Sequence, residues 1–505
     1  MYICNVYMYI CMYVRMYVRT YACPLVSGLL LITFFFVPFF RQSLQKILSL
    51  CNLRNEFIKK YIDIDTPLVE CKNIDQLHKE KGKKKLISHE PLYNPDNVVI
   101  LKNCNAFINL IDGIFFVHWD AEKDQGPTQK AECCEENKLE AHKFIKSPEE
   151  YLSSIEKVML IVQDPACKSF CYQRLKYLEH KFDFHIMFNG PSEIEESSRI
   201  IHRDFYNIRK VDTHVHHSAC MQQKTLLRFI RNKYNNEPDT VVYINENGSK
   251  ITLKEIFDNE LKNSADDATV DSLAVHALGS CFHRFDLFNE KYNPFGQQLL
   301  RNIFLKTDNY IEGRYLAEMT KNEINNLENS KYQQVEWRIS IYGRNKNEWE
   351  KLSKWVLNNK LGNVRVRWVI QVPRLYHIYK KRNLISSFQD FLTNVFEPCF
   401  EAIKNPEHNQ EIFSFLQQVV AWDSVDDESG ISKYSTKSGE LPTPDKYISE
   451  NNPPYSYYAY YMYINIRTLN DFLAARKMRT LAFRYIYIYI DMCCLSGCVV
   501  VHMCS

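Results

Sequence analysis

Short hydrophobic runs alternate with longer amphipathic segments through the second half of the chain, from about residue 205. The runs of strand length are Lys210–His216, Arg338–Gly343, Val364–Pro373, Val419–Val425 and Thr480–Arg484. The segments between them, whose apolar positions recur with helical spacing, are Gln223–Tyr234, Lys254–Leu261, Glu312–Leu327, Lys346–Leu357, Ile385–Ile403 and Tyr455–Lys477. Repeated alternation of this kind predicts an α/β fold in which helices cover a parallel sheet.

The region before this alternation has a different pattern. Val98–Leu101 and Gly113–Val117 predict strands of a small sheet. Pro148–Gln163 and Lys168–Lys181 predict helices, the second with Phe170 and other apolar residues on one face. We therefore expect a small α+β region ahead of the strand–helix body.

Composition divides the chain into segments. In order, they are a low-complexity and apolar segment (1–45), a polar Lys-rich linker (46–91), the α+β region (92–204), the strand–helix body (205–484) and an unrelated tail (485–505). The short repeated sequences at the two ends, such as Met-Tyr-Ile-Cys and Tyr-Ile-Tyr-Ile, are what AT-rich DNA encodes. One interpretation is therefore that both ends are translated non-coding DNA, and the other is that the first segment is a genuine anchor.

Composition also limits the function classes. A chain of 505 residues with 46% hydrophobic residues can bury a large core. The net charge of +3 is too balanced to indicate a nucleic-acid partner. The 17 cysteines include no two Cys-x-x-Cys motifs at zinc-binding spacing. This favours reduced thiols and a cytoplasmic protein. The alternative location is a membrane, through the apolar run at residues 25–40, although a spanning helix needs roughly 20 residues.

Two histidines, His214 and His216, close the first predicted strand of the body. Residues i and i+2 of a strand face the same side, so both imidazoles could bind one metal ion. A catalytic zinc site usually has three protein ligands and an open position, so this pair would be only part of one. A strand that ends in metal ligands and is followed by a helix is typical of a barrel active site. The alternative is a polar strand end with two hydrogen-bonded histidines.

From about Leu92 to Arg484 the sequence resembles the AMP deaminase family, a group of zinc aminohydrolases. The sequence motifs that carry the resemblance are Lys210–His216, Phe282–Gly296, Leu305–Tyr310, Trp337–Arg344, Trp368–Tyr376, Ser424–Ser429 and Ser449–Tyr458. The resemblance implies a (β/α)8-type barrel, of which about five of the eight strands are present here. It also implies hydrolytic deamination of AMP to IMP and ammonia in purine salvage, by a complete protein that is a homo-oligomer.

The resemblance assigns roles to particular residues. His214 and His216 become ligands of one zinc ion, and His216 also contacts the substrate. The segment that lies along the bound nucleotide comprises Leu287, Phe288, Asn289, Glu290, Lys291 and Tyr292. Leu287 stands where the family commonly has lysine, which removes one positive charge near the site. Lys291, Arg284, Arg338 and Arg344 are candidates to bind the phosphate, although each arginine could instead be a surface or supporting residue.

The remaining sequence motifs of the family have no match in this chain. After Phe483-Arg484 the chain continues as Tyr485–Ile490, where the family has Pro-His-Cys-Gly-Glu. His502 is the only histidine after His408, and its surroundings match no family word. We therefore expect no catalytic acid or base here, and an inactive chain as written. Two alternatives stay open. The first is a non-catalytic homologue that acts as a binding or regulatory subunit. The second is an adenosine deaminase, because that family shares the His-x-His motif.

Several other polar or aromatic residues are interpreted as structural. His217 points away from the ligand pair and is expected to be packed, while His283 at most supports the ligands. Asp426, Asp427 and Glu428 form a carboxylate cluster that we interpret as supporting rather than catalytic. Tyr455–Tyr463 is expected to pack on the barrel, and not to stack on bases.

Overall fold

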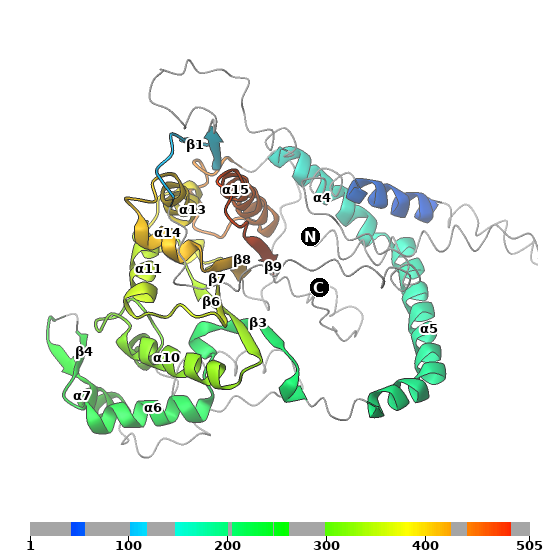
Figure 1. Cartoon of the computed structure of the whole chain (residues 1–505). Helices are drawn as coiled ribbons and strands as arrows, with labels where there is room; N and C mark the ends of the chain where they lie inside the picture. Colours follow the sequence, from blue (N-terminus) through cyan, green and yellow to red (C-terminus); the bar gives the residue numbers. More distant parts are fainter. Residues whose placement is uncertain are drawn as a thin grey trace, which may run out of the picture. The chain divides into compact units, whose positions relative to one another are not determined.

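The structure is a computed structural model that describes residues 42–55, 101–118, 147–199, 205–245, 247–261, 298–425 and 442–485. It divides into two compact units (Figure 1). The first unit comprises residues 1–91, 140–204 and 434–441, and the second comprises 92–139, 205–433 and 442–505. The second unit contains the strand–helix body.

A five-stranded sheet is the centre of the second unit. Its strands, in spatial order, are β3 (Lys210–His216), β6 (Gln333–Ser340), β7 (Val366–Pro373), β8 (Val419–Val425) and β9 (Ala482–Tyr485). All four pairings are parallel, and the sheet curls as part of a barrel (Figure 1). The predicted α/β class and incomplete (β/α)8 barrel are therefore confirmed.

Helices connect these strands. They are α6 (Gln223–Asn236), α7 (Leu253–Ile256), α9 (Gln298–Phe304), α10 (Arg314–Asn329), α11 (Glu348–Asn358), α12 (Tyr376–Lys381), α13 (Phe388–Lys404), α14 (Gln410–Leu416) and α15 (Tyr455–Ala475). A small hairpin of β4 (Val241–Ile244) and β5 (Lys250–Thr252) precedes α7. The six predicted helices of this body are confirmed. The sequence pattern missed α9, α12 and α14, because two turns or fewer are too short to establish a helical period.

The core lies between the sheet and its helices and is rich in aromatic residues. Trp337, Trp368 and Trp422, one on each central strand, are at most 2% exposed. Trp422 packs against Trp349 of α11, with ring centroids 5.7 Å apart, and against Phe396 of α13, at 5.3 Å. Strand side chains alternate in direction, so the neighbours of these tryptophans face the opposite, concave side of the sheet.

Strand β6 begins and ends earlier than predicted, since the sequence pattern indicated Arg338–Gly343 and the strand spans Gln333–Ser340. Its first half includes Glu336, whose charged side chain faces the concave side. This residue interrupts the apolar pattern, so the pattern did not indicate the start of the strand. The strand stops because the side chain of Glu348 accepts hydrogen bonds from the N–H groups of Tyr342 and Gly343, at 2.7 and 2.9 Å. The predicted boundaries of this strand were therefore wrong.

A second hairpin belongs to the barrel unit. Strands β1 (Phe107–Ile111) and β2 (Ile114–His118) pair antiparallel, which confirms the predicted strand at Gly113–Val117. The predicted strand at Val98–Leu101 falls mostly outside the described residues, and Leu101 is not in a strand. Residues 92–204, which the sequence grouped as one region, are divided between the two units.

Asn465 of α15 attaches this hairpin to the barrel. Its Oδ1 accepts a hydrogen bond from the Phe115 N–H, and its Nδ2 donates to the Gly113 carbonyl, both at 2.9 Å. Gly113 has φ of +78°, and a Cβ there would lie 2.4 Å from a carbon of Pro444. The turn therefore requires glycine on two grounds, backbone conformation and space.

The described part of the first unit is helical. It contains residues 42–55, α4 (Pro148–Gln163) and α5 (Pro165–Ser198). Asp164 caps α5, because its Oδ1 accepts hydrogen bonds from the N–H groups of Ala166 and Cys167. Helix α4 has the predicted bounds. Helix α5 contains the predicted Lys168–Lys181 segment but is far longer, because its second half lacks the apolar periodicity on which the prediction depended.

None of the described helices combines the length and the apolar composition that a membrane-spanning helix needs. The apolar run at residues 25–40 lies outside the described residues.

Candidate metal-binding site

The two predicted ligands lie next to each other at the end of β3. The ring centroids of His214 and His216 are 5.4 Å apart, with an angle of 60° between the rings. His214 is exposed and His216 is partly buried. Two imidazoles this close on one side of a strand can approach the same ion, so the local geometry fits part of a zinc site. The assignment of these residues as ligands remains a prediction.

A bulge in β3 includes the first of the two histidines. The pairing of β3 with β6 advances from Asp212 to Val215 while the partner strand advances only from Val335 to Trp337. The extra residue lies at Thr213 or His214, which have no register partner on β6. Two arginines donate to the carbonyl oxygen of Thr213, Arg338 from β6 at 2.7 Å and Arg484 from β9 at 3.4 Å. These bonds hold the backbone from which His214 and His216 project.

Both arginines are held by carboxylates on strands that are not their direct neighbours in the sheet. Arg338 donates from Nε to Asp423 of β8 at 2.5 Å, and Asp423 is fully buried. Burial raises the pKa of Asp423, while the adjacent Arg338 guanidinium opposes that rise. Arg484 makes a two-point contact with Glu336 of β6, with Nη2 donating to Oε1 at 2.9 Å. The concave face therefore carries a network of paired charges that crosses the sheet.

His216 has a defined partner on β7. Its Nδ1 donates to Oε1 of Gln371 at 2.7 Å, and Nε2 of Gln371 donates to Oγ of Ser340 at 3.1 Å. Burial lowers the pKa of His216, the hydrogen bond to Gln371 opposes that change, and the positive charge of Arg338 adds to it, so that the pKa is lowered overall. The lowered pKa favours the neutral imidazole, which is the form that binds metal ions.

His217 is packed, as the sequence predicted. It is 2% exposed, and its Nε2 forms a 2.9 Å hydrogen bond with Oγ1 of Thr320. Its ring lies among those of Trp337, Trp355 and Trp368, with centroids 5.2 to 5.7 Å away. Burial lowers its pKa to about 3, so the ring is neutral at physiological pH. His217 is therefore a core residue that supports β3 from the helix side.

A third ligand is not found in the part of the chain that the structure describes. No group of three or more His, Cys, Asp or Glu side chains that could hold a metal ion occurs there. Several sequence candidates fall outside the described ranges, namely Leu287, Phe288, Asn289, Glu290, Lys291 and Tyr292 of the substrate segment, as well as His283, Arg284, Asp426, Asp427, Glu428 and His502.

The two described phosphate candidates are occupied by protein partners. Arg338 is buried and bound to Asp423 and Thr213. Arg344, just beyond β6, pairs with Glu348 at 2.7 Å and with Asp308 at 3.1 Å. These contacts favour the alternative interpretation, in which both arginines are supporting residues.

Sequence reasoning missed the polar partners of the site. These partners lie on β6 to β9, within segments that have the apolar pattern of buried strands. They are Glu336, Ser340, Gln371, Asp423 and Arg484. The available signal was the polar residues that interrupt apolar strands, such as Gln371 in Trp368-Val-Ile-Gln-Val-Pro373. In a strand, such an interruption marks the face opposite the helices.

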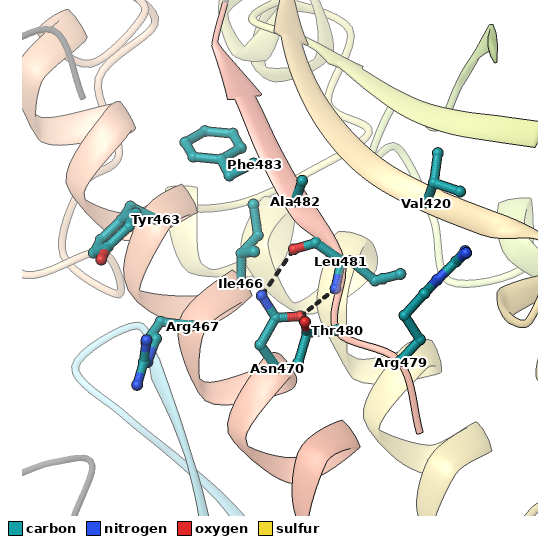
Figure 2. A pocket seen from close by; sticks show the side chains of 10 residues that line it. All are labelled: Val420, Tyr463, Ile466, Arg467, Asn470, Arg479, Thr480, Leu481, Ala482 and Phe483. Carbon is teal, nitrogen blue, oxygen red and sulfur yellow. Dashed lines mark hydrogen bonds between the residues drawn. The ribbon is translucent and has the colours of Figure 1, made fainter. Parts of the chain in front are cut away.

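A hollow of about 470 Å³ lies elsewhere in this unit, beside β9 and α15 (Figure 2). Three of its polar side chains have partners. Asn470 accepts a hydrogen bond from the N–H of Leu481 and donates one to its carbonyl, each at 2.8 Å. Arg467 pairs with Asp471 at 3.1 Å, and Arg479 donates to the Val419 carbonyl at 2.9 Å. These contacts secure the start of β9 and are separate from the histidine pair.

Comparison with known proteins gives a consistent result. A family model described as AMP deaminase matches residues 39–487. The chain is 49% identical over 335 residues to AMP deaminase of Saccharomyces cerevisiae, which covers 66% of the chain and 41% of that protein. It is 48% identical over 336 residues to AMP deaminase 3 of Mus musculus, covering 66% and 44%. It is 40% identical over 453 residues to AMP deaminase of Dictyostelium discoideum, covering 88% and 55%. The matched part is thus about half the length of these relatives.

Proposed function

Because the chain belongs to the AMP deaminase family, we propose that it serves the zinc-dependent hydrolysis of AMP to IMP and ammonia in purine salvage. Its part in that reaction is to supply five barrel strands and two zinc ligands, His214 and His216. The observation that carries the proposal is the placement of these imidazoles together at the end of a parallel strand. Barrel enzymes keep their catalytic residues at this end of the strands.

The chemistry places defined demands on the site. When bound, zinc supplies a water that loses a proton near pH 7. His216 contributes Nε2, since its Nδ1 proton is bound to Gln371. The Arg338–Asp423 and Arg484–Glu336 pairs keep the β3 backbone in position through the Thr213 carbonyl. Protonation of the purine ring requires a carboxylic acid, and orientation of the attacking oxygen requires a base.

We propose that the 505-residue chain does not complete this site alone and is inactive as written. The support is that the described residues bring only two metal-type side chains together. Two histidines should bind zinc weakly, so the dialysed protein should contain clearly less than one zinc per molecule. Elemental analysis measures this directly, and tightly bound stoichiometric zinc would contradict the proposal.

Substrate choice tests the family assignment against adenosine deaminase. Residues 1–484 are joined to the corresponding C-terminal half of the Saccharomyces cerevisiae relative, and ammonia release is measured with AMP and with adenosine. We expect a clear preference for AMP, because the curated relatives are AMP deaminases. Preference for adenosine would reject the AMP assignment. Zinc binding without deamination of either compound would favour the non-catalytic alternative.

Location and assembly are the remaining parts of the proposal. The described cysteines form no disulfide, which supports a reducing compartment such as the cytoplasm. A homo-oligomer is supported by helix α5, which exposes many large apolar side chains. They include Tyr172, Leu175, Tyr177, Phe182, Phe184, Met187 and Phe188.

A further inference from the structure

Gln371 lies where three strands bring polar side chains together. It pairs in register with Ser340 of β6 on one side and with Asp423 of β8 on the other. Its neighbours Ile370 and Val372 are fully buried against the helix layer. By alternation, the amide of Gln371 faces the concave side, toward the histidines of β3.

The two ends of this amide have different partners. Oε1 accepts a hydrogen bond from Nδ1 of His216 at 2.7 Å, and Nε2 donates to Oγ of Ser340 at 3.1 Å. With Nε2 against Oγ of Ser340, Oε1 is the end of the amide that meets the imidazole. Because an amide oxygen can only accept, the proton of His216 lies on Nδ1, and Nε2 is the nitrogen with the coordinating lone pair.

The adjacent His217 shows the opposite arrangement. Its Nε2 is bound to Thr320 among tryptophan rings, on the helix side of the sheet. Two consecutive histidines are thus held by different nitrogens. Only His216 faces the concave side, so only its partner determines which nitrogen could meet a metal ion there.

We infer that Gln371, held by Ser340, is a positioning residue that keeps His216 in its Nδ1–H tautomer and directs Nε2 to the zinc ion. This inference depends on the proposed function for its metal, while the tautomer itself is independent of any metal. Outer partners of ligating histidines fix ring orientation in this way, and their loss typically costs about 10- to 100-fold in metal affinity.

The test uses the full chain with ¹⁵N-labelled histidine. In the metal-free protein, ring ¹⁵N shifts report the tautomer, and a His216→Gln variant identifies the His216 signals. Cobalt(II) titration, followed by visible absorbance, reports metal affinity. We expect Gln371→Leu to lose the Nδ1–H tautomer of His216 and to weaken cobalt binding about 10- to 100-fold.

Two further variants separate positioning from general damage. Gln371→Glu keeps an acceptor for Nδ1 and should restore both the tautomer and the cobalt affinity. Thr320→Val removes the matched bond to His217, and should alter the His217 signals while leaving cobalt affinity unchanged.

The inference is overturned if Gln371→Leu leaves the His216 tautomer and the cobalt affinity as they are in the wild-type chain. It is also overturned if Thr320→Val weakens cobalt binding as much as Gln371→Leu does. If the tautomer depends on Gln371 but the wild-type chain binds no cobalt, the His216–Gln371 coupling is supported and the proposed metal site is rejected.

Discussion

His216 and His217 are neighbours in the sequence but lie in opposite environments. His216 faces the concave side, where polar side chains from four strands meet. His217 faces the helices and is surrounded by three tryptophans. Identical side chains therefore have different protonation chemistry, because the strand turns one toward the site and the other into the core.

His217 should make the barrel unit sensitive to acid. Its pKa is about 3 in the folded chain and about 6.5 when exposed in the unfolded chain. Above pH 6.5 both states are neutral, and this group has no effect on stability. Below pH 6.5 only the unfolded state binds the proton, so stability falls as the pH decreases toward 3, by about 2 kcal/mol at pH 5.

The measurement compares the metal-free wild-type chain with a His217→Leu variant. Urea unfolding is followed by tryptophan fluorescence at pH 7 and pH 5. The wild type should lose more stability between the two pH values than the variant does, whatever their stabilities at pH 7. Equal losses would show that His217 can be protonated in the folded state.

The sequence predicted the histidine pair and the packing of His217, because strand alternation is a local property. It did not predict Gln371 or Asp423 as partners, because their contacts join residues 155 and 85 positions apart. Nor did it show that Arg338 is occupied by Asp423. Such pairings depend on how the strands are ordered in the sheet, which is not visible in any single segment.

At the scale of the elements, the Arg338–Asp423 pair connects β6 to β8 across β7. Both side chains are almost fully buried. Arg338→Met or Asp423→Leu alone should each destabilise the barrel by about 3–5 kcal/mol, because a buried charge is left without its partner. The double variant should recover most of that loss, since both charges are removed together.

Urea unfolding measures the free energy of unfolding of the wild type, the two single variants and the double variant, with the adjacent Trp337 and Trp422 as fluorescent reporters. A double variant whose destabilisation equals the sum of the two single losses would show that the pair is not coupled.

Asn465 should control the attachment of the β1–β2 hairpin to α15. In Asn465→Leu, the Phe115 N–H and the Gly113 carbonyl lose their partner, at a cost of about 1–3 kcal/mol. We expect faster hydrogen exchange in peptides that cover Phe107–His118. The matched control is Asn470→Leu on the same helix, whose amide makes two similar bonds to Leu481. It should accelerate exchange near β9 and leave the hairpin unchanged, and the opposite pattern would reject this assignment.

Some elements were predictable and others were not, for physical reasons. Helix α15 and strand β7 have continuous apolar patterns and were predicted within two residues of their bounds. Strand β6 was displaced because its concave face is charged, so only half of its residues follow a hydrophobic pattern. Helix α5 was underestimated because its exposed aromatic side chains follow no single face.

At the scale of the whole molecule, the described sheet has two outer strands, β3 and β9, each with one neighbour. An outer strand offers unpaired backbone groups to other chains. Val211 of β3 is 50% exposed. Val211→Lys should therefore reduce concentration-dependent association, because a lysine on an edge strand opposes pairing.

The control is Val364→Lys, which adds the same charge at a position that is 48% exposed and lies outside the strands. Sedimentation velocity over a range of concentrations compares the two variants with the wild type. Equal effects of both substitutions would indicate that net charge, and not the strand edge, governs association.

The most direct test of the central claim is the AMP deaminase activity of residues 1–484 joined to the C-terminal half of the Saccharomyces cerevisiae relative, with zinc content measured on the same preparation. We expect about one zinc per chain and release of ammonia from AMP, and expect both to be lost in His214→Ala and in His216→Ala. Activity and zinc content that persist in both variants would contradict the assignment of the His-x-His pair as zinc ligands.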